Sequence, residues 1–271
     1  MWKKTVKHGK CELCLLDKPL CDSHLIPRSV YALCRATGAK NPNPFLVTRL
    51  FAMQTSRHMQ VPLLCFECEQ LLRERGEDWV VPELARYPAP FPFFDKLRAA
   101  TPLYNEPDII AYVLNSVPQV RTPELIHFFM GIFWKASVHA WRKGRKDPWI
   151  NLGTFSEFIR RFLRSEAPFP EKVALSITVL PPPVTLVAFY PPYETIGPDP
   201  SFHLYISGFN CTLCVGDHVA PELALSSIHR PPHHLLVVDN AAEIKKKFRD
   251  SYEAARARGK AKPIPVPPGR N

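Results

Sequence analysis

Six of the eight cysteines in this 271-residue chain are arranged in Cys-x-x-Cys pairs. The pairs are Cys11/Cys14, Cys65/Cys68 and Cys211/Cys214. In a reducing compartment, such pairs bind metal more often than they form disulfides. The first two pairs supply the four thiolates that a tetrahedral zinc ion requires. The sequence therefore predicts a structural zinc on Cys11, Cys14, Cys65 and Cys68, against the alternative of four unrelated buried thiols.

The third pair, Cys211/Cys214, lies in a β-like region and lacks a second Cys-x-x-Cys pair to complete a site. Cysteine is among the most frequently buried residue types. Packing is therefore the preferred interpretation of this pair. His218 lies close in sequence, which leaves a partial metal site open as the alternative.

Between the first two pairs, the segment Cys21-Asp-Ser-His-Leu-Ile-Pro27 places a histidine before two apolar residues and a proline. The order of a Cys-x-x-Cys pair, this histidine segment and a second pair at a helix start resembles the HNH endonuclease superfamily. The resemblance implies a treble-clef ββα-metal fold in which His24 is the general base that activates water against a DNA phosphodiester. It also implies a divalent ion, Mg²⁺ or Mn²⁺, at the scissile phosphate. An imidazole with a pKa of about 6.5 can accept a proton at neutral pH.

The motifs that carry this resemblance cover residues 11–75, about a quarter of the chain. Residues 129–137 and 152–160 add a weaker similarity to an uncharacterised group of bacterial HNH-like proteins. That group implies no established activity.

Several positions depart from the HNH pattern. The residue before the base is Ser23 rather than an acidic metal ligand. Asp22, one position earlier, is a candidate ligand of the divalent ion, although it faces the other side of the strand. Glu69 and Glu74 lie on the helix that would face the divalent ion, so either could supply its carboxylate ligand. These departures leave open a catalytically degenerate relative, in which His24 only packs beside the zinc. Three residues are candidates for the middle Asn of the superfamily: Asn41, Asn43 and His58.

The elements that must position these residues are short in the first part of the chain. The first cysteine pair lies on a turn before a strand that ends near Leu25, and residues 27–35 have helical spacing. Residues 45–51 are β-like in composition. The second pair opens a helix, residues 66–75, with acidic residues early and arginines late, as the helix dipole favours.

Two longer helices are predicted downstream. Residues 122–141 begin with Thr122 as N-cap and Pro123 at the first helical position, and are apolar nearly all round, which predicts a buried central helix. Residues 154–164 are amphipathic, with Phe158 inside and Arg160 outside. A period of two then predicts strands at 173–180, 184–190, 202–206, 211–215 and 235–238, followed by a final helix at 241–258.

The net charge of +10 is unevenly distributed. Residues 1–64 carry +7, residues 65–244 carry −4 and residues 245–271 carry +7. A basic segment attracts a polyanion through counterion release, so nucleic acid, and DNA first, is the predicted partner. Solvated surface charge is the alternative. The candidate contacts are Arg28, Arg49, Lys245, Lys246 and Lys247.

No apolar run reaches the roughly 20 residues that span a bilayer, and no apolar region follows the basic N-terminus as in a signal peptide. The sequence thus predicts a cytoplasmic protein without a membrane partner.

With 46% apolar and 22% charged residues, the chain can bury one large core or two modest ones, which excludes disorder of the whole chain. The predicted class is α+β. A zinc-bound treble-clef ββα module occupies residues 1–76, and a connector with short helices at 94–100 and 107–116 occupies 77–121. A helical plus antiparallel β domain follows at 122–258, then a basic disordered tail at 259–271.

The leading functional hypothesis is a metal-dependent HNH-type endonuclease that hydrolyses DNA, serving defence or mobile-element biology. The alternative is a degenerate zinc-binding protein that binds nucleic acid or acts as a scaffold in a larger complex. In the scaffold case, the C-terminal domain would dock a protein partner.

Overall fold

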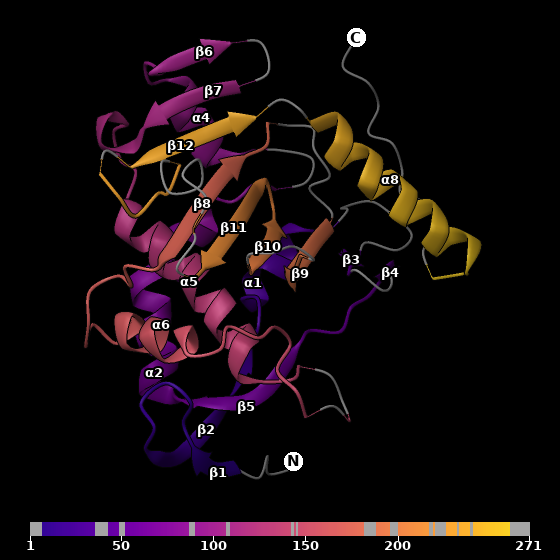
Figure 1. The fold of residues 1–271 in the computed structure, drawn as a ribbon. Helices are drawn as coiled ribbons and strands as arrows, with labels where there is room; N and C mark the ends of the chain where they lie inside the picture. Colours follow the sequence, from indigo (N-terminus) through magenta and orange to yellow (C-terminus); the bar gives the residue numbers. More distant parts are fainter. Residues whose placement is uncertain are drawn as a thin grey trace.

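Two sheets, one of three strands and one of nine, organise the part of the chain that the computed structural model describes (Figure 1). That part comprises residues 7–35, 43–48, 52–86, 90–106, 109–141, 144, 146–181, 188–195, 200–216, 219, 226–231, 233–238 and 241–260. Helices and strands are both abundant, so the predicted α+β class is confirmed. The predicted tail at 259–271 lies outside the described residues apart from its first two positions.

The small sheet has the order β1-β2-β5 and contains the predicted cysteine motifs. Strand β1 (Lys7–Lys10) pairs antiparallel with β2 (Asp17–His24), and β2 pairs antiparallel with β5 (Gln60–Cys65). Helix α2 (Phe66–Leu72) follows β5 directly. It continues into the π-helical turn η1 (Arg73–Glu77) and then α3 (Asp78–Glu83). Strand β2 and helix α2 correspond to the strand predicted to end near Leu25 and to the helix predicted after the second cysteine pair.

The large sheet has the order β4-β3-β9-β10-β11-β8-β12-β7-β6. The strands are β3 (Phe45–Val47), β4 (Ala52–Gln54), β6 (Tyr104–Glu106), β7 (Ile109–Val113), β8 (Val173–Val179), β9 (Ala188–Glu194), β10 (Ser201–Ile206), β11 (Phe209–Val215) and β12 (His234–Val238). Most neighbours are antiparallel, as predicted, but β3 with β9 and β8 with β12 are parallel. Parallel neighbours need long crossover connections, and both pairs join segments far apart in the chain.

The large sheet crosses the boundaries expected from the sequence. Strands β3 and β4 come from the region assigned to the N-terminal module, and β6 and β7 come from the connector. The helix predicted at 107–116 is wrong, because residues 109–113 form β7 between β12 and β6. One continuous cluster of buried side chains extends from Cys11 near the N-terminus to Val237 in β12. The predicted segments therefore share a core.

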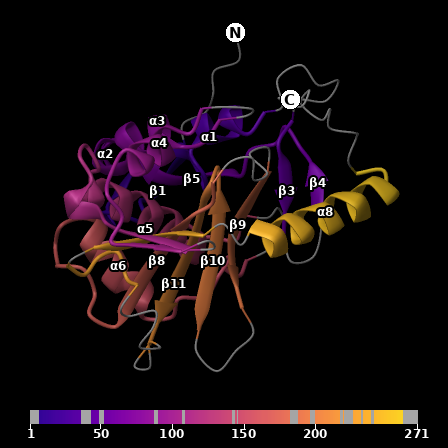
Figure 2. The same cartoon turned by 90° about the horizontal axis from the view of Figure 1, so that it is seen from above.

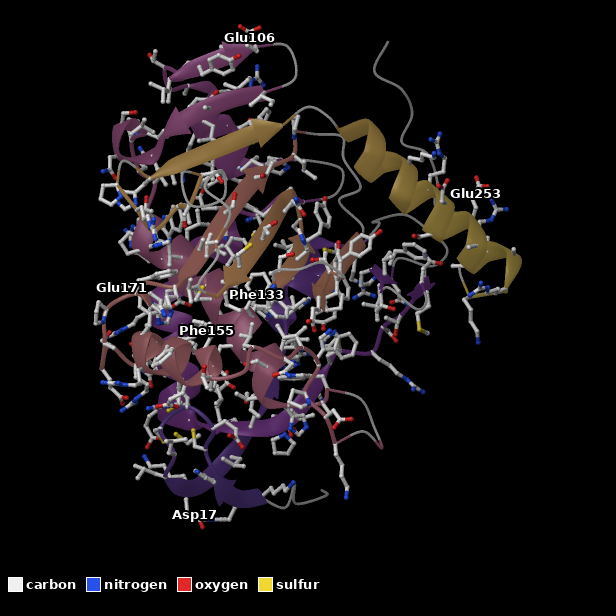
Figure 3. The ribbon with its side chains drawn as sticks, in the orientation of Figure 1. Asp17, Glu106, Phe133, Phe155, Glu171 and Glu253 are labelled. Carbon is white, nitrogen blue, oxygen red and sulfur yellow. The ribbon has the colours of Figure 1, made fainter. Side chains whose placement is uncertain are left out.

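Helix α5 (Thr122–Val138) is the centre of this core, as predicted. Phe133 is fully buried and lies in the middle of the molecule, whereas Asp17 and Glu106 lie at opposite ends (Figure 3). Thr122 is the first helical residue rather than the N-cap, which is Arg121. Among the described helices, none is both long and apolar enough to cross a membrane.

The remaining helices are distributed unequally around the large sheet. Helix α1 (Arg28–Leu33) lies with α3 and α4 (Pro92–Arg98) on one side of it (Figure 2). Helix α6 (Phe155–Leu163) packs against α5. Helix α8 (Ala241–Ala257) lies beside β3 and β4 at the end of the sheet (Figures 1 and 2). There, Tyr252 and Ala255 pack in a second cluster with Phe45.

Candidate metal centre

The four cysteines predicted as metal ligands converge at the end of the molecule that holds the small sheet. Their Sγ atoms all lie within 4.8 Å of one another. The turn between β1 and β2 carries Cys11 and Cys14, and Cys65 and Cys68 lie at the start of α2. The Sγ atoms of Cys14 and Cys65 are 3.9 Å apart, against about 3.8 Å for a tetrahedron with Zn–S bonds of about 2.3 Å. The donor set fits a tetrahedral metal ion.

Burial and hydrogen bonds within the cluster shift the pKa values of Cys11, Cys65 and Cys68. The pKa of Cys11 is lowered to about 4, chiefly by a hydrogen bond with the Cys68 side chain. The backbone N–H of Cys65 also donates to Cys11 Sγ, at 3.3 Å. The contact with Cys11 raises the pKa of Cys68, and burial raises the pKa of Cys65 to about 12. The lowered pKa favours the thiolate of Cys11, whereas metal binding must displace the protons of Cys65 and Cys68.

Two basic side chains, Lys18 and Arg164, lie within electrostatic range of the cysteine cluster. The hydrogen bond between Lys18 Nζ and Glu67 Oε1, at 3.1 Å, is the main reason that the pKa of Lys18 is raised, and Cys65 and Cys14 add to it. Arg164 has a raised pKa mainly because it donates to Glu166, with a smaller effect from Cys68. Four thiolates around one Zn²⁺ carry a net charge of about −2. These cations reduce the repulsion within such a centre.

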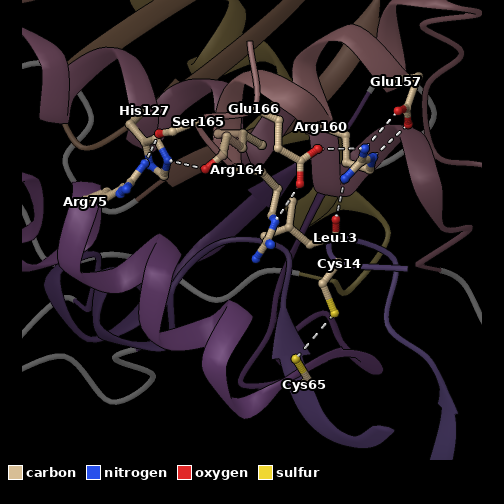
Figure 4. A network of polar contacts seen from close by, with 11 residues as sticks. Leu13, Cys14, Cys65, Arg75, His127, Glu157, Arg160, Arg164, Ser165 and Glu166 are labelled. Atoms are coloured by element: carbon tan, nitrogen blue, oxygen red, sulfur yellow. Dashed lines mark hydrogen bonds and ion pairs between the residues drawn. The ribbon is translucent and has the colours of Figure 1, made fainter. Parts of the chain in front are cut away.

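Arg160 of helix α6 bonds to the turn that carries Cys11 and Cys14, here called the cysteine turn, and connects it to the rest of the molecule (Figure 4). The Arg160 guanidinium donates to the Leu13 carbonyl oxygen at 2.8 Å, to Glu157 Oε2 at 2.7 Å and to Glu166 Oε2 at 3.0 Å. The prediction that Arg160 faces solvent is therefore wrong: its side chain is 10% exposed, whereas Phe158 is 48% exposed. A buried guanidinium is stable here because acceptors satisfy its donors.

His24, the predicted general base, is the last residue of β2 and is half-buried. Its Nε2 is buried and has no hydrogen-bond partner among the described residues. The His58 ring lies 5.5 Å from the His24 ring, centroid to centroid, and stacks on Tyr31 at 4.3 Å. Burial, followed by His58 and Lys135, lowers the pKa of His24. His24 is thus a neutral imidazole at pH 7.

Glu69 lies on α2. It is close enough to His24 that its negative charge partly offsets the lowering of the His24 pKa. Its Oε1 is also buried without a hydrogen-bond partner in the described part of the chain. The other two predicted carboxylate ligands are placed differently. Glu74 accepts a hydrogen bond from Gln70 at 2.6 Å and lines another cavity, and Asp22 is exposed. Ser23, between Asp22 and His24, is buried and accepts a hydrogen bond from the Leu64 N–H.

The cysteine cluster is the one group of three or more His, Cys, Asp or Glu side chains placed to hold a metal among the residues that the structure describes. His24 and Glu69 do not gain a third protein ligand from Asp22 or Glu74. Of the candidates for the middle Asn, the structure places His58 beside His24. Asn43 lines a cavity with His58, and Asn41 lies outside the described residues.

Lys135 is the residue at this site that sequence reasoning missed. Its side chain is 3% exposed, and Nζ donates to the His24 carbonyl oxygen at 2.8 Å and lies 3.8 Å from Glu77 Oε1. The signal was present in the sequence as a single charge within the apolar run of residues 125–138. Lys135 connects the central helix to the end of β2 and thereby fixes the backbone of His24.

We expect Lys135→Met to lower the free energy of unfolding by about 3 kcal/mol at pH 7.5, because it leaves the Glu77 carboxylate without its buried partner. Burial raises the pKa of Glu77, and Lys135 opposes that rise. In the variant, the Glu77 pKa rises further, so folded protein binds the proton more tightly than unfolded protein. Stability should then recover as the pH falls towards the ordinary Glu value.

Urea unfolding of the Lys135→Met variant at pH 7.5 and 5.5 measures both effects. The double variant Glu77→Gln/Lys135→Met removes both charges and should recover much of the loss. Equal stability of Lys135→Met and the parent protein at both pH values would contradict a buried ion pair.

The remaining predicted site residues are dispersed or undescribed. Arg28 is exposed on α1, and Lys246 is exposed on α8, away from the small sheet (Figure 1). Arg49 and the side chains of Lys245 and Lys247 lie outside the described residues. The two whose side chains the structure describes, Arg28 and Lys246, therefore lie on separate helices.

Cys211 and Cys214 are buried in β11, and burial alone raises the pKa of Cys211. They join no metal-binding group among the described residues, as their packing interpretation requires. His218, the alternative partner for this pair, lies outside the described residues.

No protein-family model, curated protein or solved structure matches the chain. The resemblance to the HNH superfamily therefore stays a prediction, based on the motifs in residues 11–75. The geometry of the cysteine cluster, of His24 and of Glu69 stands independently of it.

Proposed function

We propose that the small sheet and α2 form a zinc-stabilised HNH-type endonuclease site that hydrolyses DNA phosphodiesters, with His24 as general base. The observation that carries this proposal is that two of the buried polar atoms without partners, His24 Nε2 and Glu69 Oε1, belong to residues within electrostatic range of each other. Buried polar atoms are almost always hydrogen-bonded. Two exceptions within electrostatic range of each other are typical of a site that a ligand completes. The lowered pKa of His24 keeps its ring able to accept a proton from water.

In this proposal, the four-cysteine centre holds zinc and has a structural role. The four cysteines would hold zinc, which would supply a cross-link between the turn that precedes β2 and the start of α2. His24 lies at the end of β2 and Glu69 on α2. Fixing the turn against the helix therefore also fixes the separation between the base and the carboxylate.

The proposal includes a divalent cation such as Mg²⁺ or Mn²⁺, for which Glu69 would supply the carboxylate of this chain. Mg²⁺ commonly binds one or two carboxylates and completes its shell with water and substrate phosphate. A third protein ligand is therefore not required. When bound, such a cation would stabilise negative charge on the scissile phosphate. Lys135 holds the His24 backbone in place.

A second candidate function is nucleic-acid binding without cleavage. It is favoured by Ser23, which occupies the position of the acidic HNH ligand and is engaged with the Leu64 N–H. Such a protein would retain the zinc centre and bind DNA through phosphate contacts. Its affinity would fall steeply with salt concentration.

Supercoiled plasmid distinguishes the two candidates. Zinc-loaded protein is incubated with plasmid and Mg²⁺ or Mn²⁺, and DNA affinity is measured at several salt concentrations. The endonuclease proposal predicts nicked and linear products. Salt-dependent binding without cleavage would favour the second candidate, and the absence of both cleavage and binding would overturn both.

Glu69→Gln is expected to reduce cleavage at least about tenfold, because it removes the carboxylate charge beside His24. Glu74→Gln is the matched control: the same change on the same helical segment, but at a carboxylate that bonds Gln70 instead. Initial cleavage rates at saturating Mg²⁺ measure both. Equal rates for the two variants would show that Glu69 has no special part in the reaction.

A further inference from the structure

We propose that a cavity beside His58 binds a backbone phosphate of the DNA strand through Arg28 and Arg35. The cavity has a volume of about 220 Å³. It is lined by Arg28, Tyr31, Arg35, Asn43, Thr55 and His58, among others, and none of its described lining residues is acidic. This inference rests on the proposed function, because it supplies the substrate-binding part of the same site.

The two arginines are available to bind an anion. Arg28 begins α1 and Arg35 follows the end of that helix, and both are exposed at the cavity. Within the described residues, neither has an ion-pair partner. Other arginines do, since Arg73, Arg121, Arg160 and Arg164 each lie within 4.0 Å of a carboxylate oxygen. A guanidinium presents paired N–H donors that match phosphate oxygens.

The wall of the cavity is held rigidly around His58. Tyr31, which stacks on His58, is 3% exposed and contacts Phe189 edge-on, with ring centroids 5.1 Å apart. The Tyr31 hydroxyl accepts a hydrogen bond from the Met59 N–H at 3.2 Å. Besides burial, the charges of Arg28 and Arg35 lower the pKa of His58. The positive field of both arginines thus reaches the interior of the cavity.

His58 links this cavity to the proposed base. It lines the cavity, and its ring lies 5.5 Å from that of His24. Arg28 also contributes to the lowered pKa of His24, so its charge acts on both places. A strand phosphate held by Arg28 and Arg35 would therefore lie next to the phosphodiester that His24 addresses. The cavity would orient the strand by its backbone and would not read its bases.

The test compares the parent protein, the double variant Arg28→Gln/Arg35→Gln and the control Arg98→Gln. Arg98 is exposed on α4, and its charge affects the pKa of Tyr112 in β7. The cavity lies elsewhere, because its lining residue Tyr31 contacts Phe189 in β9, which is not a neighbour of β7 in the sheet. A 20-bp DNA duplex is titrated by fluorescence anisotropy without added Mg²⁺. Inorganic phosphate and dimethyl phosphate are titrated at constant ionic strength while the His58 ring resonances are recorded by NMR.

We expect the double variant to bind DNA at least about tenfold more weakly, and its slope of log K against log salt to fall by about 1, as for one lost phosphate contact. The control should match the parent protein. Both small phosphates should shift the His58 resonances in the parent protein and not in the double variant. Thermal unfolding checks that the exposed substitutions leave the fold intact.

Three outcomes separate this inference from the proposed function. Unchanged DNA affinity with a phosphate response would assign the cavity to a free phosphate compound and overturn the strand contact. Unchanged DNA affinity together with no phosphate response would overturn the site itself. Weakened DNA binding in the double variant, together with a parent protein that does not cleave plasmid, would support the phosphate site and reject the endonuclease.

Discussion

Cys65→Ala is expected to remove the bound zinc and to destabilise the whole chain, which is the largest effect on stability that the structure predicts. Parent protein should contain about one zinc per chain. Apparent binding free energies of structural zinc are about 10–16 kcal/mol in zinc-finger peptides, and loss of a metal is among the few single-site changes that exceed about 4 kcal/mol. Cys65 is the last residue of β5 and the N-cap of α2, and its N–H donates to Cys11 Sγ.

The damage should spread beyond the small sheet. Cys11 and Leu64 belong to the same buried cluster as Phe133 of α5, so loosening the cysteine turn exposes part of the common core. Elemental analysis measures the zinc content, and thermal unfolding with limited proteolysis measures the stability. Proteolysis should cut first within the first 83 residues.

Cys211→Ala is the matched control for Cys65→Ala, since it removes an equally buried thiol that lies outside the cysteine cluster. It should keep the zinc and lose only about 1 kcal/mol of stability. Full zinc occupancy in Cys65→Ala would contradict the assignment of the centre. So would parent protein that contains no zinc after purification from zinc-supplemented cells.

Local patterns in the sequence were sufficient for the elements that carry the cysteines. Two Cys-x-x-Cys pairs, one on a turn and one at a helix start, predicted a cluster that the structure assembles from segments 50 residues apart. The buried helix α5 and most strands after residue 173 were also predicted, because their hydrophobic periodicity is long enough to be distinctive.

The large sheet could not be predicted in full, because its outer strands are short and pair at long range. Strands β3, β4 and β6 have three residues each, which is too few to show a period of two. Their partners are set by tertiary contacts: β3 pairs with β9, more than 140 residues further along the chain. Residues 109–113 looked helical in isolation and form a strand because β6 and β12 flank them.

Sequence reasoning placed Arg160 at the surface and overlooked Lys135, and both errors have the same physical reason. Hydropathy assigns arginine and lysine to the surface, yet Arg160 and Lys135 are buried because specific acceptors satisfy them. Those acceptors are the carbonyl oxygens of Leu13 and His24, more than 100 residues away in sequence. Neither contact has a local signature. The same holds for His58, whose position beside His24 results from the pairing of β2 with β5.

His24→Ala is expected to reduce plasmid cleavage by a factor of about 10²–10⁴, the usual contribution of a general base, while leaving the zinc content unchanged. His8→Ala is the matched control, because His8 is an exposed histidine on the neighbouring strand β1 and should retain full activity. Initial rates with Mg²⁺ give the comparison. Unfolding of both variants confirms that they are folded at the assay temperature.

The pH dependence of the reaction gives the His24 prediction a second, independent test. A base must be neutral to accept a proton, and burial, His58 and Lys135 all lower the pKa of His24 below 6.5. Activity of the parent protein should therefore persist as the pH falls below 6.5, and decline only when the pH passes through this lowered value. His24→Ala should lose that acidic limb altogether. Residual cleavage in His24→Ala with an unchanged acidic limb would assign the base to another residue, and cleavage equal to that of His8→Ala would exclude His24 from the reaction.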